Sequence, residues 1–178
     1  MTYKEKRDHK FKILFMYYAK NGNIDSIISN YFENYPYESD EENTYIYGSN
    51  SSHKNISNVT IKSEEDTFQN ESDKAVTLTI TDEDNIYDIT QKVQDVIQKT
   101  DEIDEMIKKN LESWDIKRVG KAELTIIRLA LYEMYYDNTI DIPVAINEAV
   151  ELAKTYCDQK ADKFVNGVLA TIYKSKIK

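Results

Sequence analysis

The stretch KADKFVNGVL, residues 160–169, combines lysine, asparagine and glycine at helical spacing. Lys160, Lys163 and Gly167 share one face of a helix built on this stretch, and Asn166 lies at its margin. A glycine among lysines lets a phosphate backbone approach closely while the ammonium groups neutralise it. The asparagine amide could add a hydrogen bond to a base edge or a sugar hydroxyl. This face therefore indicates nucleic-acid binding, although a glycine used for helix packing beside solvated lysines gives the same pattern.

A second basic segment lies in residues 5–20, where apolar residues also recur at helical spacing. Lys6, Lys10 and Tyr17 share a sector of that helix away from its apolar stripe, and Arg7 lies nearer the margin. Cationic side chains can hold phosphates, and an exposed tyrosine can stack on an unpaired base. A partly buried Tyr17 is an equally good interpretation of the pattern.

The sequence offers little for catalysis or metal binding. Glu148 and Glu151 lie three residues apart on one helix face, a spacing that could serve acid–base chemistry. No glycine-rich phosphate loop, nucleophile elbow or supporting histidine accompanies them. Cys157 is typical of a small half-buried hydrophobic residue, and His9 and His53 lack the spacing of metal ligands. We therefore predict no enzyme activity, no metal site, no cofactor and no small-molecule substrate.

The acidic charge of the chain is concentrated in one segment. The formal net charge is −9, and residues 38–85 hold twelve acidic residues and three lysines, which accounts for all of it. The rest of the sequence is neutral overall, with basic residues gathered in residues 1–12 and 160–178. A net negative charge argues against a nucleic-acid partner, but this distribution leaves two basic ends available.

The cysteine content and the hydropathy favour a cytoplasmic protein. A single cysteine excludes an intrachain disulfide and fits a reducing compartment. No apolar run is long enough to span a bilayer, and the basic N-terminal segment leads to no small-residue cleavage site. We therefore expect neither an integral membrane protein nor a secreted one.

Apolar periodicity predicts an all-α protein of about seven helices. The expected helices cover residues 5–20, 24–35, 86–100, 101–111, 120–136, 144–157 and 158–175. Residues 120–136 are apolar over most of the helix circumference, which is typical of a central, buried helix. Pro143 suits the first turn of the helix that follows.

Residues 38–85 interrupt this helical pattern. They are rich in Ser, Asn, Thr, Asp and Glu, which predicts disorder or a long loop. Two short pieces, NVTIK (58–62) and AVTLTIT (75–81), alternate like strands and could form a small β-ribbon. We therefore divide the chain into a first helical part (1–37), an acidic insertion (38–85) and a second helical part (86–178).

Three segments carry a resemblance to a known family. They are AELTIIRLALYEM (122–134), VAINEAVELAKTY (144–156) and DKFVNGVL (162–169). In order and spacing they resemble the C-terminal half of the NusB family of bacterial transcription antitermination factors. The resemblance implies a non-enzymatic protein of two small helical bundles. Family members pair with NusE, a ribosomal small-subunit protein, on boxA RNA and help the transcription elongation complex read through terminators, notably in ribosomal RNA operons.

The resemblance also implies site residues, because the family's RNA surface uses the last helix together with the N-terminal basic helix. Carried to the matching positions, the RNA-binding residues are Lys6, Arg7, Lys10, Tyr17, Lys160, Lys163, Asn166 and Gly167. Glu123 matches an acidic position that members use against NusE. The helix dipole also favours an acidic residue in a first helical turn, which is the simpler explanation of Glu123.

Two alternatives belong to other classes of protein. Ribosomal RNA cytosine methyltransferases carry a NusB-like domain, but this chain has no room for a glycine-rich cofactor-binding unit. A helical protein-binding scaffold that has lost RNA contact is the second alternative. Steep salt dependence of RNA affinity would separate the leading function from that scaffold.

Arg128 lies within the almost wholly apolar central helix, so its charge needs a partner if it is buried. We predict a structural role in an internal ion pair, with Glu133, Glu148 or Glu151 as the candidate partner.

Overall fold

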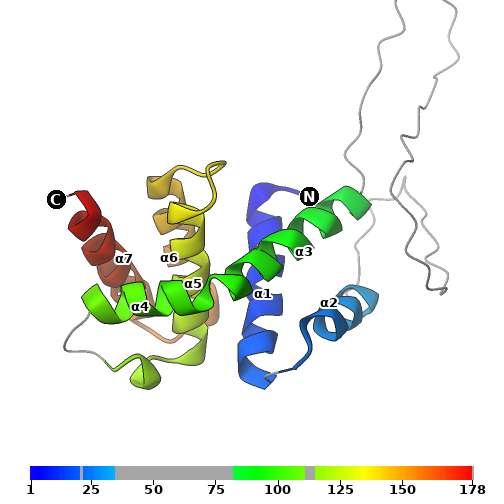
Figure 1. Ribbon diagram of the computed structural model, residues 1–178, viewed down its shortest axis with the longest axis horizontal. Coiled ribbons are helices and arrows are strands. Elements are labelled where there is room, and N and C mark those ends of the chain that lie inside the picture. The colour runs from blue at the N-terminus through cyan, green and yellow to red at the C-terminus, as the bar shows by residue number, and fades with distance from the viewer. Residues whose placement is uncertain (21, 35–81, 111–114, 178) are drawn as a thin grey trace, which may run out of the picture. The chain divides into compact units, whose positions relative to one another are not determined.

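The computed structural model describes residues 1–20, 22–34, 82–110 and 115–177, and all of its helices belong to one compact unit (Figure 1). The elements are α1 (Tyr3–Lys20), α2 (Ile24–Glu33), α3 (Asp82–Gln98), α4 (Thr100–Asn110), a 3-10 turn η1 (Ile116–Arg118), α5 (Lys121–Tyr135), α6 (Ile142–Tyr156) and α7 (Ala161–Ile177). These ranges contain no strand, and the all-α prediction is confirmed. None of the described helices is long and apolar enough to cross a membrane.

The helices form two bundles that meet at α5. α1 packs against α2 and α3 in the first bundle, and α4, α5, α6 and α7 pack together in the second. α5 also packs against α1 and therefore joins the bundles (Figure 1). This is the two-bundle architecture that the sequence resemblance implied.

The central position of α5 follows from its sequence. Apolar side chains on several sides of this helix are buried, including Ile126, Ile127, Leu129, Leu131 and Met134. A helix that is apolar around its circumference can bury all of that surface only between other helices. The prediction of a central helix over residues 120–136 is confirmed.

Small residues let α6 lie close to its neighbours. Ala145, Ala149 and Ala153 recur every four residues on one side of α6, and all three are buried. Their short side chains allow α5 and α7 to approach the α6 backbone. Pro143 stands in the first turn of α6, as its fixed φ and missing N–H predict.

The boundary between the insertion and the second helical part differs from the predicted one. α3 begins at Asp82, so residues 82–85, which the sequence analysis placed in the insertion, are helical. Asp82, Glu83 and Asp84 carry no apolar periodicity, but acidic residues suit the positive end of a helix dipole. Both possible β-ribbon strands, 58–62 and 75–81, lie outside the described residues.

Arg128 forms an internal ion pair, but its partner is not among the predicted glutamates. Its Nε and Nη2 donate hydrogen bonds to the two carboxylate oxygens of Asp104 on α4, at 2.8 and 2.7 Å. The guanidinium carbon also lies 4.3 Å from the centroid of the Tyr18 ring on α1. The pair therefore ties α5 to α4 beside the first bundle.

A buried histidine joins α1 to α2. His9 is buried, its Nδ1 lies 2.9 Å from the Tyr31 hydroxyl, and its ring packs edge-to-face against the Tyr31 ring. Burial lowers the pKa of His9, and the positive charge of Lys12 acts in the same direction, against the opposing effects of Asp8 and Glu5.

We expect this histidine to make stability depend on pH. Because the folded pKa lies below the ordinary value of about 6.5, the unfolded chain binds the proton more tightly. The free energy of unfolding should therefore fall as pH is lowered from about 6.5 towards the folded pKa. Urea denaturation across this window should give a flatter profile for His9→Gln. Tyr31→Phe keeps the His9 ring and should keep the slope of the free energy of unfolding against pH. If this slope is the same for His9→Gln and the unchanged chain, the pH dependence does not come from His9.

Candidate nucleic-acid interface

The residues predicted on the last helix are exposed, but Lys160 precedes the helix instead of lying on it as predicted. α7 begins at Ala161, directly after a turn in which Lys160 adopts a left-handed φ of 79°. Lys160, Lys163, Asn166 and Gly167 are all exposed, and we refer to these four residues as the α7 strip. The structure therefore places them where a polyanion could reach them.

Gly167 faces solvent and is not packed against another helix. A Cβ built on this residue would meet no atom within 4 Å. The alternative explanation, in which this glycine permits close helix packing, is therefore wrong for the described residues. Since no neighbouring helix requires the glycine, its effect is to leave the α7 backbone accessible on the face that also carries Lys163.

The lysines of the α7 strip are available for a ligand. No ion pair in the part of the chain that the structure describes involves Lys160 or Lys163. Lys174 continues the exposed basic surface along the same helix. Further on, the ammonium group of Lys176 lies 3.6 Å from the centroid of the Tyr135 ring on α5. Lys160 and Lys163 thus form no ion pair among the described residues, although Asp162 lines the same hollows as each of them.

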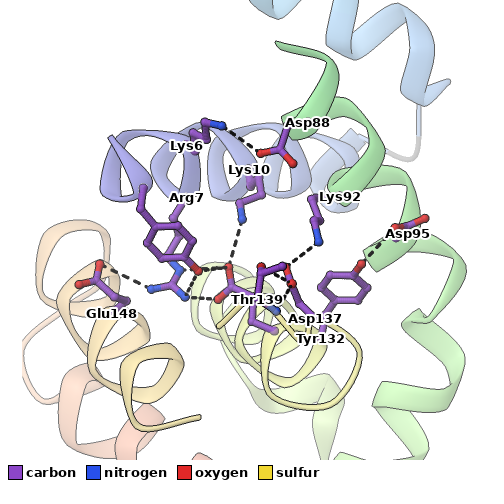
Figure 2. Close-up of polar contacts among 12 residues, drawn as sticks. Lys6, Arg7, Lys10, Asp88, Lys92, Asp95, Tyr132, Asp137, Thr139 and Glu148 are labelled. Atoms are coloured by element: carbon purple, nitrogen blue, oxygen red, sulfur yellow. Dashed lines mark hydrogen bonds and ion pairs between the residues drawn. The ribbon is translucent and has the colours of Figure 1, made fainter. Parts of the chain in front are cut away.

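The predicted cations of α1 lie in a different environment. Arg7 and Lys10 are buried, at 1% and 4% exposure, and both point towards α5 (Figure 2). Arg7 Nε donates to Glu133 Oε1 at 3.2 Å, its Nη2 pairs with Glu133 Oε2, and Lys10 Nζ lies 3.2 Å from Glu133 Oε1. These two residues are therefore not on the accessible surface, and their charges are already balanced by Glu133 inside the protein.

Two more side chains complete this buried cluster. The Tyr3 hydroxyl accepts a hydrogen bond from Arg7 Nη2 at 3.0 Å and donates one to Glu133 at 3.3 Å. Arg7 Nη1 lies 3.5 Å from a carboxylate oxygen of Glu148 on α6 (Figure 2). We call Tyr3, Arg7, Lys10, Glu133 and Glu148 the Glu133 cluster; it connects α1, α5 and α6.

A second set of polar contacts fixes α3 beside the Glu133 cluster (Figure 2). Lys92 on α3 pairs with the buried Asp137 at 2.8 Å, and the Tyr132 hydroxyl donates to Asp95 at 3.1 Å. Burial alone would raise the pKa of Asp137, but hydrogen bonds from Lys92 and Thr139 hold it below its ordinary value. This carboxylate therefore stays charged at neutral pH and anchors the end of α5 to α3.

The last two α1 predictions are only partly exposed. Lys6 lies 3.2 Å from Asp88 on α3, so its ammonium already has a counter-charge. Tyr17 is half-buried and packs edge-to-face against Tyr18, with ring centroids 5.3 Å apart. An RNA contact at Lys6 would have to compete with Asp88.

The two groups of predicted residues come from α1 and from α7 with the turn that precedes it. α5 and α6 lie between α1 and α7 (Figure 1). The contact between α1 and the end of α6 was missed by the sequence analysis. The Tyr156 ring packs at a tilt against the Phe11 ring, with centroids 4.8 Å apart. Its hydroxyl donates to Asp8, and Lys12 lies 6.0 Å from its ring centroid. Lys12 shares the helix of the predicted cations, but only the fold reveals its aromatic neighbour.

Glu123 lies in the first turn of α5 and is half-buried. Its carboxylate folds back over Gly120, where a Cβ would clash with it. Burial raises the pKa of the Cys157 thiol to about 11, and the charges of Glu123 and Asp158 act in the same direction. The Glu123 carboxylate therefore lies near the end of α6. A thiol with this pKa is neutral at physiological pH and is a poor nucleophile.

The described residues contain no group of His, Cys, Asp and Glu side chains that could hold a metal ion. The two glutamates that might have served acid–base chemistry are both engaged elsewhere. Glu148 faces Arg7, and Glu151 pairs with Lys154 at 2.7 Å. Both carboxylates therefore already have cationic partners.

The family comparison and the comparison with curated relatives both point to one family. A sequence model of the NusB family matches residues 51–174. The transcription antitermination protein NusB of Carboxydothermus hydrogenoformans is 50% identical over 80 residues, which is 45% of this chain and 56% of that protein. The NusB protein of Listeria innocua is 41% identical over 100 residues, which is 56% of this chain and 77% of that protein. The chain therefore spans just over half the length of the first of these relatives.

A solved structure of the antitermination factors NusB and NusE in complex with double-stranded RNA contains a chain of the same fold. The TM-score is 0.63 at 23% identity, and the match covers 98% of this chain and 99% of that chain. At this identity the likeness concerns the fold alone, and it agrees with the all-α architecture described above.

We expect the Glu133 cluster to be essential for stability. Glu133→Ala should lower the free energy of unfolding by about 3–5 kcal/mol, because Lys10 would stay buried without a counter-charge and Arg7 would keep only its contact with Glu148. Glu151→Ala removes a carboxylate from an exposed pair and is the matched control, with an almost unchanged unfolding midpoint. Urea denaturation followed by circular dichroism measures both. Similar small losses in the two variants would mean that the cluster is not a stabilising core element.

Proposed function

The chain belongs to the NusB family, and from that premise we propose that it is an RNA-binding transcription antitermination factor. It pairs with NusE on boxA-type RNA within the transcription elongation complex and promotes readthrough of terminators, notably in ribosomal RNA operons. It acts in the cytoplasm, without enzymatic activity and without a cofactor.

The α7 strip is the observation that carries this proposal. It combines exposed lysines with an exposed glycine that no internal packing requires. Phosphate groups need both features, cationic charge for neutralisation and open backbone for close approach. Lys160, Lys163, Asn166 and Gly167 are therefore the proposed RNA contacts of the second bundle. Lys6 and Tyr17 are secondary candidates on α1, whereas the burial of Arg7 and Lys10 supports a structural role for them.

Glu123 is the proposed contact for NusE. It carries a partly exposed negative charge at the start of α5, beside the turn that leads into the α7 strip. A protein partner bound there would lie next to RNA held by α7. The two proposed interfaces would then meet at one end of the second bundle, so that one RNA could touch both proteins.

A protein-binding scaffold without RNA contact is the second candidate function. The burial of Arg7 and Lys10 and the pairing of Lys6 with Asp88 favour it, because α1 then presents fewer free cations than its sequence indicates. It predicts a stable complex with NusE but RNA affinity no higher than that of a scrambled sequence.

Fluorescence anisotropy tests the two candidates directly. A labelled boxA-bearing RNA and a scrambled RNA are titrated with the full chain, alone and with NusE, over a series of salt concentrations. The proposed function predicts selective binding that NusE strengthens and that falls steeply with salt. A complex with NusE but no selective RNA binding would instead establish the scaffold.

The variant Gly167→Ala separates ligand contact from folding. Alanine should stabilise α7 by about 0.5–1 kcal/mol, because a glycine in a helix loses more backbone entropy and the added methyl group meets no neighbour. The same methyl group should weaken RNA binding if the phosphate backbone approaches this position. Urea denaturation and anisotropy measure the two effects. A variant that is more stable and binds RNA equally well would remove Gly167 from the interface.

A further inference from the structure

An open groove runs between α6 and α7 beside the α7 strip. Its volume is about 560 Å³, which lies within the range of about 300–1,000 Å³ for small-ligand sites. Ile146 and Val150 from α6 and Tyr173 from α7 line it and are half-buried. The groove therefore has an apolar lining with one aromatic ring, which suits a flat, partly apolar group.

Two amides lie on opposite sides of this groove. Asn147 comes from α6 and Asn166 from α7, and both line the groove and are exposed. Within the described residues, neither side chain has a hydrogen-bond partner. Each amide offers a donor and an acceptor, the combination that the edge of a nucleobase requires.

Three charged residues line the groove: Lys154, Lys163 and Asp162. Lys154 pairs with Glu151 at 2.7 Å, and the charge of Asp162 also acts on it, so the charge of Lys154 is already balanced. Lys163 has no ion pair among the described residues and belongs to the α7 strip as well. A phosphate is therefore favoured at Lys163 rather than at Lys154.

We propose that this groove holds one unpaired base of the RNA whose phosphates lie on the α7 strip. The proposal rests on the proposed function and names a subsite of the same interface. The base enters between Asn147 and Asn166 and rests against Tyr173, while its 5′ or 3′ phosphate meets Lys163. An unpaired base is required, because a base inside a duplex cannot present both its face and its edge to the protein.

The variant Asn147→Ala tests the subsite, because Asn147 lies on α6 and outside the α7 strip. Losing a contact to a base edge should lower the affinity of the full chain for boxA RNA about tenfold. Asn138→Ala removes another exposed asparagine and is the matched control, with unchanged affinity. Because Asn147 is exposed, the variant should fold normally, which urea denaturation verifies.

A scan of abasic substitutions along the RNA then locates the base. At one position, the abasic RNA should bind the unchanged chain about tenfold more weakly, and Asn147→Ala should cause no further loss. If Asn147→Ala lowers the affinity further for every abasic RNA, whatever the position of the missing base, the subsite is overturned. If Asn147→Ala has no effect while Lys163→Gln still weakens RNA binding, the subsite is wrong and the proposed function stands.

Two further outcomes would also decide against the subsite. If Asn147→Ala weakens the complex with NusE in the absence of RNA and leaves RNA binding unchanged, the groove binds protein. If the unchanged chain binds no RNA even with NusE, both the subsite and the proposed function are overturned.

Discussion

The carboxylate of Glu133 is buried where α1, α5 and α6 meet, and the arrangement of these helices depends on how its charge is balanced. Arg7 and Lys10 lie one helical turn apart on α1, so both reach the same carboxylate. A buried charge without a partner costs several kcal/mol, whereas a paired one is tolerated. Rotating α1 would separate both cations from Glu133 at once. The cluster therefore fixes the rotation of α1 against the second bundle in a way that apolar contacts alone would not.

This constraint also decides which basic residues are available to a polyanion. Cations used to balance Glu133 and Asp88 cannot neutralise phosphate without breaking those pairs. The lysines of the α7 strip have no such commitment among the described residues. Screening limits the reach of surface charges to about 8 Å at physiological salt. The net charge of −9 is therefore a weaker guide to binding than the local pattern on α7.

Much of the fold could be predicted because its information is local. Periodicity identified the helices, and the uniform apolarity of residues 120–136 identified α5 as central. The motifs in residues 122–169 carried the family resemblance, which the comparisons confirmed. The start of α3 was placed too late because Asp82–Asp84 resemble the acidic insertion in composition. Their position at a helix N-terminus was not visible in any apolar pattern.

The candidate site was predictable only where exposure follows from the helix itself. Lys163, Asn166 and Gly167 lie on the polar side of α7, so their exposure follows from spacing. Arg7 and Lys10 also lie away from an apolar stripe, yet they are buried by a carboxylate more than one hundred residues away in the sequence. Arg128 likewise pairs with Asp104 instead of with any of the three predicted glutamates.

The same α5 helix carries Glu123 in its first turn and Glu133 near its end, which bears on how two partners could influence each other. A conformational mechanism would require a second arrangement of the core with a similar free energy. If α5 slid against α1, the charges of the Glu133 cluster would lose their partners or become exposed to solvent. If α5 tilted away from α4, the Arg128–Asp104 pair would break. The described core therefore favours one arrangement. The proposed strengthening of RNA binding by a protein partner would then come from an added contact surface, in which each partner raises the effective concentration of the other's binding groups.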